Sequence, residues 1–254
     1  MITAGIDVGS QVIKVVLLND GKIAGYSVLK AGFDLAKSSE QALEMALDNA
    51  KLPRSEVNRF IATGTGRKEV PYTQDSVLEI IADAKAAIWL SPQVRTIIDI
   101  GNEQALGIRC DSAGKVVAYG KNDKCAAGVG AFVETVARVL EVPAEELGEL
   151  SRKATLEVSL NFTCAVFAES EVVSLIHAKT SKADIARAIN DAIAMRVSGM
   201  VGRVGVEKEV MVIGGVAKNI GIIDRLKHHL GVDITVPEEP QIVTALGAAL
   251  IARD

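Results

Sequence analysis

Residues 5–10 of the chain read GIDVGS and residues 99–104 read DIGNEQ. In both stretches an aspartate (Asp7, Asp99) ends an apolar run, and a glycine follows two positions later. Alternating residues and turn residues predict three short strands around each stretch, at 3–7, 12–18 and 22–29 and again at 96–99, 104–110 and 115–119. The repeated order of strand, tight turn, strand, turn and strand indicates an internal duplication, although two unrelated hairpins could match by chance.

The rest of the chain supplies the helices and buried strands of an α/β fold. Helical periodicity predicts helices at residues 38–51, 76–90, 129–140, 183–204 and 241–253, and apolar runs predict buried strands at 57–63 and 209–213. The strand pattern restarts after Pro92. We therefore expect one subdomain from residues 1–92 with 240–254, and a second from residues 93–239.

Composition limits the class of protein. The chain has 254 residues, enough to bury a sizeable core, and its formal net charge of −4 argues against a general binder of nucleic acid or anionic membranes. Its apolar runs are shorter than a membrane span, and its first residues predict a strand instead of a signal peptide. Three cysteines without scaffold spacing fit a reducing compartment, so we expect a cytoplasmic protein.

The turn at residues 5–10 carries groups that suit a phosphate and a metal ion. Its glycines allow backbone N–H groups to approach an oxyanion, and the Asp7 carboxylate can hold a hydrated magnesium ion. Lys14 can reach a phosphate from the returning strand. Taken alone, the stretch also fits a plain hairpin with a capped turn.

Two further stretches repeat this chemistry. The turn at residues 99–104 carries Asp99 and another glycine, and residues 214–219 (GGVAKN) follow a buried strand and permit close approach to an adenosine. Two carboxylate–glycine hairpins on separate subdomains suit a nucleoside triphosphate with Mg²⁺ in a cleft between them. The alternative for residues 214–219 is an ordinary strand-to-helix turn.

Two cysteines lie in small-residue stretches that precede predicted helices. Cys125 belongs to residues 122–130 (NDKCAAGVG), and Cys164 precedes residues 165–171 (AVFAESE). The positive end of a helix favours a thiolate, and two such thiolates are half of the ligand set of a four-cysteine iron–sulfur cluster. A second copy of the chain or a paralogue would supply the other half. The alternative is that both are buried small hydrophobic residues, as we expect for Cys110.

The order of these turns, with residues 245–247 (ALG) in the closing helix, resembles the acetate kinase, sugar kinase, heat-shock chaperone and actin superfamily. Within it, the two cysteine stretches resemble the activator ATPases of 2-hydroxyacyl-CoA dehydratases and the related ATPase subunits of benzoyl-CoA reductase. The resemblance covers essentially the whole chain. It implies two duplicated ribonuclease-H-like subdomains, as in actin-like ATPases, with a nucleotide cleft between them.

The resemblance also implies a function and its ligands. One 4Fe–4S cluster per dimer would lie between two subunits, each giving Cys125 and Cys164. ATP hydrolysis to ADP, with Mg²⁺, would drive a low-potential electron from the cluster into a CoA-ester dehydratase or reductase. The partner in the dimer would be another copy or a paralogue, and a ferredoxin or flavodoxin is the expected electron donor. Neither nucleic acid nor a membrane is expected as a partner.

The predicted site residues fall into three groups. Those expected to act on the phosphates and the metal ion are Asp7, Asp99, Glu103 and Gln104. Those expected to contact the nucleotide are Gly9, Ser10, Gln11, Lys14, Gly101, Asn102, Gly128, Gly130, Gly214, Gly215, Ala217, Asn219 and Gly247. The predicted cluster ligands are Cys125 and Cys164.

Some positions depart from the family pattern. Residues 101–104 read GNEQ where the activators usually carry Gly-Gly-Gln-Asp, and Gln11 stands where a threonine is common. Residues 79–84 (EIIADA) lack a frequent Cys-His pair. These departures favour an alternative, the D-type ATPase subunit of a benzoyl-CoA-type reductase paired with an A-type paralogue. Hydrolysis would then depend on Glu103 to position water.

Two alternatives come from other classes of protein. A small-molecule kinase of the same fold would need a general-base aspartate beside a substrate hydroxyl, and the sequence offers none that can be assigned. A nucleotide-dependent scaffold or sensor would need no cysteine motif. The paired cysteine stretches argue against both alternatives.

Overall fold

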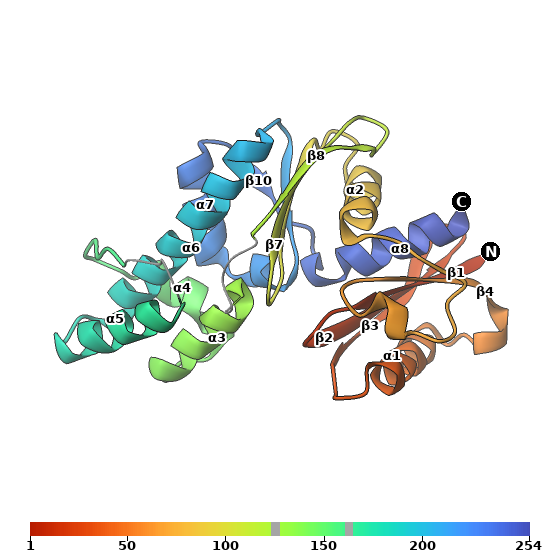
Figure 1. Ribbon diagram of the computed structural model, residues 1–254, viewed down its shortest axis with the longest axis horizontal. Coiled ribbons are helices and arrows are strands. Elements are labelled where there is room, and N and C mark those ends of the chain that lie inside the picture. Colours follow the sequence, from red (N-terminus) through yellow and green to blue (C-terminus); the bar gives the residue numbers. More distant parts are fainter. Residues whose placement is uncertain (123–127, 161–164) are drawn as a thin grey trace. The chain divides into compact units, whose positions relative to one another are not determined.

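The first three strands form an antiparallel meander, as the sequence predicts. In the computed structural model of the chain they are β1 (Ile2–Val8), β2 (Val12–Asn19) and β3 (Lys22–Lys30) (Figure 1). The β2–β3 turn has φ of 49° at Asp20 and 79° at Gly21. Positive φ at both positions is the pattern of a type I′ two-residue hairpin, which Asp-Gly favours. The structure describes residues 1–122, 128–160 and 165–254.

Two parallel strands complete the first sheet. β4 (Val57–Thr63) pairs with β1, and the short β5 (Asp75–Ser76) pairs with β4. The strand order is β3-β2-β1-β4-β5, with antiparallel pairs on one side of β1 and parallel pairs on the other. The sequence predicts a helix from residue 76, but α2 (Glu79–Leu90) begins later because Ser76 pairs with β4.

Helix α1 (Leu35–Ala50) covers one face of the first sheet. Its N-cap is Asp34, whose carboxylate accepts from the Lys37 N–H at 2.9 Å. Leu43 of this helix and Ile6 of β1 belong to one buried cluster. Burial of such aliphatic side chains contributes about 1.5–3 kcal/mol each, so this face forms the core of the first half.

Helix α8 (Val243–Arg253) covers the opposite face. The Thr3 hydroxyl of β1 donates to the Ala249 carbonyl oxygen of this helix at 2.9 Å. The close approach depends on Gly5, because a Cβ at that position would stand 2.0 Å from the Ala245 carbonyl oxygen. Successive residues of β1 on this face therefore lie progressively nearer the N-terminal end of α8, in the order Thr3, Gly5 and Asp7.

The second sheet repeats the first. Its strands are β6 (Thr96–Ile100), β7 (Ala105–Cys110), β8 (Val116–Lys121), β9 (Val210–Ile213) and β10 (Ile234–Thr235). β6 pairs antiparallel with β7 and parallel with β9, and the strand order is β10-β9-β6-β7-β8. From the opposite edge, this is the order of the first sheet with β6–β10 in place of β1–β5. The match confirms the duplicated α/β fold that the sequence predicts.

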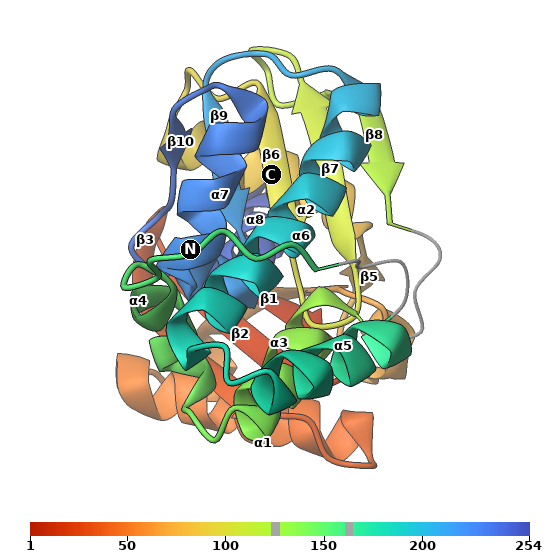
Figure 2. The same ribbon diagram turned by 90° about the vertical axis from the view of Figure 1, so that its left-hand side faces the viewer.

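Helices pack against the second sheet and against one another. They are α3 (Val129–Val139), α4 (Leu147–Ser151), α5 (Ala165–His177), α6 (Lys182–Val204) and α7 (Ile220–Leu230). Figure 2 shows the long α6 beside α7. Ser181 caps α6 by accepting from the Asp184 N–H at 3.1 Å, and Gly205, with φ of 89°, ends it.

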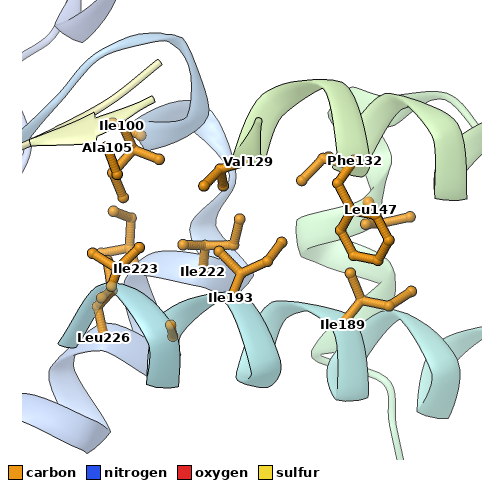
Figure 3. Packing of buried hydrophobic residues seen from close by; sticks show 14 of the residues in the cluster. Ile100, Ala105, Val129, Phe132, Leu147, Ile189, Ile193, Ile222, Ile223 and Leu226 are labelled. Atoms are coloured by element: carbon orange, nitrogen blue, oxygen red, sulfur yellow. The ribbon is translucent and has the colours of Figure 1, made fainter. Parts of the chain in front are cut away.

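The core of the second half lies between the sheet and these helices. Figure 3 shows buried side chains from β6, β7, α3, α4, α6 and α7 converging in it. Phe132 and Ile193 are among the large side chains with almost no exposure. Short 3-10 helices complete the connections: η1 (Arg54–Glu56), η2 (Arg67–Glu69), η3 (Ala144–Glu146), η4 (Gly215–Lys218) and η5 (Pro240–Ile242).

Two compact units result, each with one sheet at its centre. Unit 1 comprises Met1–Val94, Cys110–Val117 and Glu238–Asp254, and unit 2 comprises Arg95–Arg109 and Ala118–Pro237. This division differs from the predicted subdomains, residues 1–92 with 240–254 and residues 93–239, mainly in placing the β7–β8 turn in unit 1. Within the part of the chain that the structure describes, no helix has the length and apolar character of a membrane span.

Candidate functional site

The carboxyl end of β1 brings a carboxylate and an ammonium group together. Lys14 lies opposite Asp7 in the β1–β2 pair, and its Nζ donates to Asp7 Oδ2 at 2.9 Å. These side chains are 17% and 9% exposed, so water screens the pair only in part. The Gly9 N–H donates to the Val12 carbonyl oxygen at 3.2 Å and closes the turn. The predicted phosphate turn of unit 1 therefore presents an anion and a cation at one strand end.

Gly64 follows the neighbouring strand β4 and lies against Asp7. Its φ is 89°, and a Cβ there would stand 2.5 Å from Asp7 Oδ1 and 2.5 Å from the Val8 carbonyl oxygen. Only glycine fits this position without displacing the carboxylate. The Gly66 N–H donates to the same Val8 carbonyl oxygen at 2.9 Å, and Arg67 Nη1 donates to the Gly64 carbonyl oxygen at 3.1 Å.

The second half repeats this arrangement around Asp99. Gly214, after β9, also has a φ of 89°, and a Cβ there would stand 2.4 Å from Asp99 Oδ1 and 2.5 Å from the Ile100 carbonyl oxygen. The Gly101 N–H donates to the Gln104 carbonyl oxygen at 2.9 Å and closes the β6–β7 turn. The duplication thus extends from strand order to individual atoms around the two aspartates.

Residues 64–67 (GTGR) belong to this arrangement but are not among the site residues predicted from the sequence. Their likeness to residues 214–217 (GGVA) could have identified them as site residues from the sequence. Both stretches follow a buried strand that pairs in parallel with the aspartate strand, and both open with glycine. Each half therefore contributes two glycine turns, one after its first strand and one after its fourth.

The turn after Asp99 packs against the beginning of α3. A Cβ at Gly128 would stand 2.0 Å from Glu103 Cα and 2.1 Å from the Asn102 carbonyl oxygen. The Gly130 N–H donates to the Gly101 carbonyl oxygen at 3.3 Å, and a Cβ at Gly130 would stand 2.8 Å from Asn102 Cα. The structure thus brings together five predicted site residues of unit 2 and explains both glycines by close backbone packing.

Two of the other predicted nucleotide contacts have structural roles in their own unit. Asn219 caps α7, because its Oδ1 accepts from the Gly221 and Ile222 N–H groups at 3.0 and 3.2 Å. Gly247 lets α8 approach α2, since a Cβ there would stand 1.9 Å from the Ala82 carbonyl oxygen. Their contact with a nucleotide stays a prediction.

Exposure separates the remaining predicted residues. Ser10, Gln11, Glu103 and Gly215 are partly or fully exposed at the ends of their strands, whereas Ala217 is buried. The first four positions can meet a ligand from solvent. Ala217 is 3% exposed and belongs to the core cluster of unit 2, so its side chain packs inward.

Both predicted cluster ligands, Cys125 and Cys164, lie outside the described residues. Cys110 is described: it is buried, and its Sγ lies 3.9 Å from the Val94 carbonyl oxygen. This burial confirms the prediction that Cys110 is structural. The described side chains include no group of three or more His, Cys, Asp or Glu residues that could hold a metal ion alone.

The groups around Asp7 fit a hydrated magnesium ion with a phosphate. Mg²⁺ prefers oxygen ligands, and it keeps several waters and shares the phosphates of its substrate instead of requiring a cage of carboxylates. Asp7 supplies such a carboxylate, and the Lys14 ammonium suits a phosphate. The absence of a Cβ at Gly64 lets the backbone lie against Asp7 Oδ1 without displacing the carboxylate.

Two halves with one strand order, each with an aspartate beside two glycine turns, define a protein of the duplicated, actin-like ATPase class. The chain belongs to the BadF/BadG/BcrA/BcrD ATPase family, whose model matches residues 4–252. It is therefore an ATPase by family. Nucleotide binding is a property of this family, and the aspartate turns are interpreted as a nucleotide site on that basis.

Three comparisons place the chain within this family. It is 41% identical over 255 residues to the activator of lactoyl-CoA dehydratase from Anaerotignum propionicum, covering 100% of this chain and 98% of that protein. It is 30% identical over 261 residues to the D-type subunit of benzoyl-CoA reductase from Thauera aromatica, covering 98% and 92%. The solved activator of the 2-hydroxyisocaproyl-CoA dehydratase from Clostridium difficile with bound ADPNP is 37% identical, with a TM-score of 0.95 over 99% of this chain and 94% of that one.

Proposed function

We propose that this chain is an ATP-dependent electron-transfer protein that delivers a low-potential electron to a CoA-ester dehydratase or reductase. The observation that carries the proposal is the family match over residues 4–252, which includes the glycine turns of both halves and the paired cysteines Cys125 and Cys164. Relatives that share 37–41% of their residues with the chain bear the names of dehydratase activators.

The nucleotide chemistry is assigned to the aspartate turns. Asp7 would hold the hydrated Mg²⁺, and Lys14 would neutralise a phosphate oxygen beside it. Glu103, exposed on its turn, would orient the water that attacks the γ-phosphorus, with Asp99 and Gln104 supporting the same turn. The bond from the γ-phosphorus to the bridging oxygen breaks, and ADP leaves with the electron pair.

The electron chemistry is assigned to Cys125 and Cys164. With the same two cysteines of another copy they would bind one 4Fe–4S cluster, which supplies a single low-potential electron. Within this chain, the packing of Gly128 and Gly130 on the turn at residues 101–104 would couple ATP hydrolysis to electron transfer. Because α3 follows Cys125 in sequence, a shift of that turn on hydrolysis would be passed to the helix beside the predicted ligand.

The partners follow from this assignment. A second copy would complete the cluster, a ferredoxin or flavodoxin would donate the electron, and a cytoplasmic CoA-ester dehydratase or reductase would accept it. A D-type reductase subunit paired with a paralogue is the second candidate, favoured by the GNEQ sequence at residues 101–104. Whole-chain identity favours the activator instead, because it is 41% to a dehydratase activator and 30% to the benzoyl-CoA reductase protein. The activator is therefore the first candidate.

An anaerobic preparation of the chain tests the proposal. We expect about four irons per dimer and a broad visible absorption that bleaches on reduction. Cys125→Ala and Cys164→Ala should each abolish both, while Cys110→Ala, which changes a buried structural cysteine, should retain them. A colourless monomer without iron that still hydrolyses ATP would end the electron-transfer proposal and favour a kinase or a sensor.

The same preparation separates the two family candidates. A homodimeric activator should show the full iron content when this chain is purified alone, because both cysteine pairs come from identical subunits. A D-type reductase component should acquire the cluster only when it is purified with its paralogue. Mass measurement of the coloured species distinguishes these outcomes.

A further inference from the structure

Thr63 is the residue of β4 that stands beside Asp7. The two are partners in the parallel register of β1 and β4, so their side chains lie on the same face of the first sheet. Thr63 is 0% exposed, and its Oγ1 has no hydrogen-bond partner among the described residues. A buried hydroxyl without a partner is unfavourable, which indicates that a partner binds there in the working protein.

The fold does not require a hydroxyl at this position. In the second half, the β9 partner of Asp99 is Ile213, which is equally buried. Thr3 gives a second comparison, because it lies on the same face of the first sheet as Asp7, is also 0% exposed, and its hydroxyl donates to the Ala249 carbonyl oxygen. Thr3 therefore has a hydrogen-bonded hydroxyl that joins β1 to α8, whereas the Thr63 hydroxyl has no such partner among the described residues.

The helix that covers this face begins at the level of Asp7 and Thr63. Gly5, two residues before Asp7, lies against Ala245 in the first turn of α8. The N-cap residue of that helix is Ile242, which makes no side-chain capping hydrogen bond, and the 3-10 helix η5 leads directly into α8. The Thr63 hydroxyl thus lies beside a carboxylate that is suited to a hydrated metal ion, on the sheet face that α8 covers.

We propose that the Thr63 hydroxyl completes the metal–phosphate site of Asp7 and Lys14 by accepting a hydrogen bond from a water held by the Mg²⁺ of the nucleotide. Mg²⁺ gives up its waters reluctantly, so a site for it needs groups that hydrogen-bond those waters as well as a direct ligand. The inference rests on nucleotide binding by this ATPase and not on the proposed electron transfer.

Three variants test this role. Thr63→Val removes the hydroxyl and keeps the shape, Thr63→Ser keeps the hydroxyl, and Thr3→Val removes the bonded hydroxyl of the matched threonine. ADP affinity is measured by titration calorimetry with Mg²⁺ and again with EDTA. The melting temperature is measured without nucleotide.

With Mg²⁺, Thr63→Val should bind ADP about threefold to tenfold more weakly than the unchanged protein does. With EDTA, the two proteins should bind ADP equally. The melting temperature of Thr63→Val without nucleotide should be equal or higher, because no hydrogen bond is lost. Thr63→Ser should restore the Mg²⁺-dependent affinity. Thr3→Val should lower the melting temperature by about 2–4 °C and leave ADP affinity unchanged.

Two results would overturn the inference. One is an unchanged Mg²⁺-dependent affinity in Thr63→Val, which would mean that the hydroxyl binds at most a structural water. The other is a fall in melting temperature as large as that of Thr3→Val, which would mean a structural partner. If the unchanged protein bound no ADP at all, the nucleotide assignment itself would fail, whereas a loss of electron transfer alone would leave this inference standing.

Discussion

The two halves of the chain share a backbone frame and differ in the side chains beside their aspartates. Asp7 and Asp99 are each the next-to-last residue of the central strand of a sheet. A glycine with φ of 89°, Gly64 or Gly214, lies against each carboxylate. The residues in strand register with each aspartate are polar in unit 1 and apolar in unit 2: Lys14 and Thr63 for Asp7, Leu106 and Ile213 for Asp99.

This difference separates what the fold needs from what the chemistry needs. The glycines recur in both halves because the backbone passes the carboxylate too closely for a Cβ. In strand register, polar residues lie beside Asp7 and apolar residues lie beside Asp99, so strand pairing itself does not require polar neighbours at these positions. We infer that unit 1 holds the metal and the charge of the phosphates, while unit 2 contributes a turn that packs on α3.

The largest effect is expected from Asp7→Asn. Loss of the metal-holding carboxylate should lower kcat for ATP hydrolysis on the order of 10²- to 10³-fold, whereas Asp99→Asn should cost about tenfold, because its neighbours in register are apolar. Steady-state ATPase assays with circular dichroism as a control for folding provide the measurement. Equal losses in the two variants would contradict the division of roles.

Replacing the two matched glycines should have equal effects. Gly64→Ala and Gly214→Ala each place a Cβ within 2.5 Å of an aspartate oxygen at positive φ, and each should lower the free energy of unfolding by about 2–4 kcal/mol. Gly199→Ala in α6 is the control: a Cβ there meets nothing within 4 Å, so it should stabilise by up to about 1 kcal/mol. Urea unfolding measures the free energy of unfolding of all three variants. Unequal losses in Gly64→Ala and Gly214→Ala would show that the surroundings of the two glycines are not equivalent.

Removing the cation beside Asp7 should have a smaller effect. Lys14→Met leaves the carboxylate largely buried without this ion pair, and the free energy of unfolding should fall by about 1–3 kcal/mol. Lys22→Met on β3 changes an exposed lysine of the same sheet and should alter stability by less than about 0.5 kcal/mol. An equal loss of unfolding free energy in both variants would show that the Asp7–Lys14 ion pair contributes no more to stability than an exposed lysine does.

The smallest effect concerns an ion pair of unit 2 that lies away from the aspartate turns in sequence. Burial raises the pKa of Asp191, but hydrogen bonds with Arg225 and His229 outweigh it and leave the pKa below the ordinary value. A lowered carboxylate pKa stabilises the fold at pH values above the unfolded pKa, and the contribution is lost as pH falls through the folded pKa.

Asp191→Asn should therefore cost up to about 1 kcal/mol at pH 7 and progressively less as pH falls below about 4. Urea unfolding at several pH values measures the difference, with the exposed Asp233→Asn as the control. A cost that stayed constant down to about pH 3 would show that the side chain acts through packing instead of charge. ATP hydrolysis at pH 7 should be unchanged, which separates this structural pair from Asp7 and Lys14.

Much of the fold could be predicted from the sequence because its strands carry strong local signals. The meander around residues 2–30 and the strand at Val57–Thr63 follow from alternation, apolar runs and the Asp20-Gly21 turn. Helix α7 was not predicted, although Asn219 and Gly231 mark its two ends and its apolar residues recur at helical spacing. Length does not explain the omission, because α3 and α8 also have 11 residues and were predicted.

The site was harder to predict than the fold. Asp7 and Asp99 stand out because each precedes a glycine turn, whereas the closeness of Gly64 and Thr63 to Asp7 depends on the pairing of β4 with β1. A threonine at the end of a strand is typical β-structure and carries no signal of its own. Asn219, predicted to contact the nucleotide, has a helix-capping role that the sequence alone did not separate from binding.

The most direct test of the account measures electron transfer itself. The protein is reconstituted anaerobically with iron and sulfide, reduced, and mixed with a 2-hydroxyacyl-CoA dehydratase while visible absorption is followed. We predict that the absorption lost on reduction returns when MgATP is added, and stays bleached with ADPNP or in the Asp7→Asn variant. A return at the same rate without nucleotide, or in Asp7→Asn with MgATP, would contradict ATP-driven electron transfer by this chain.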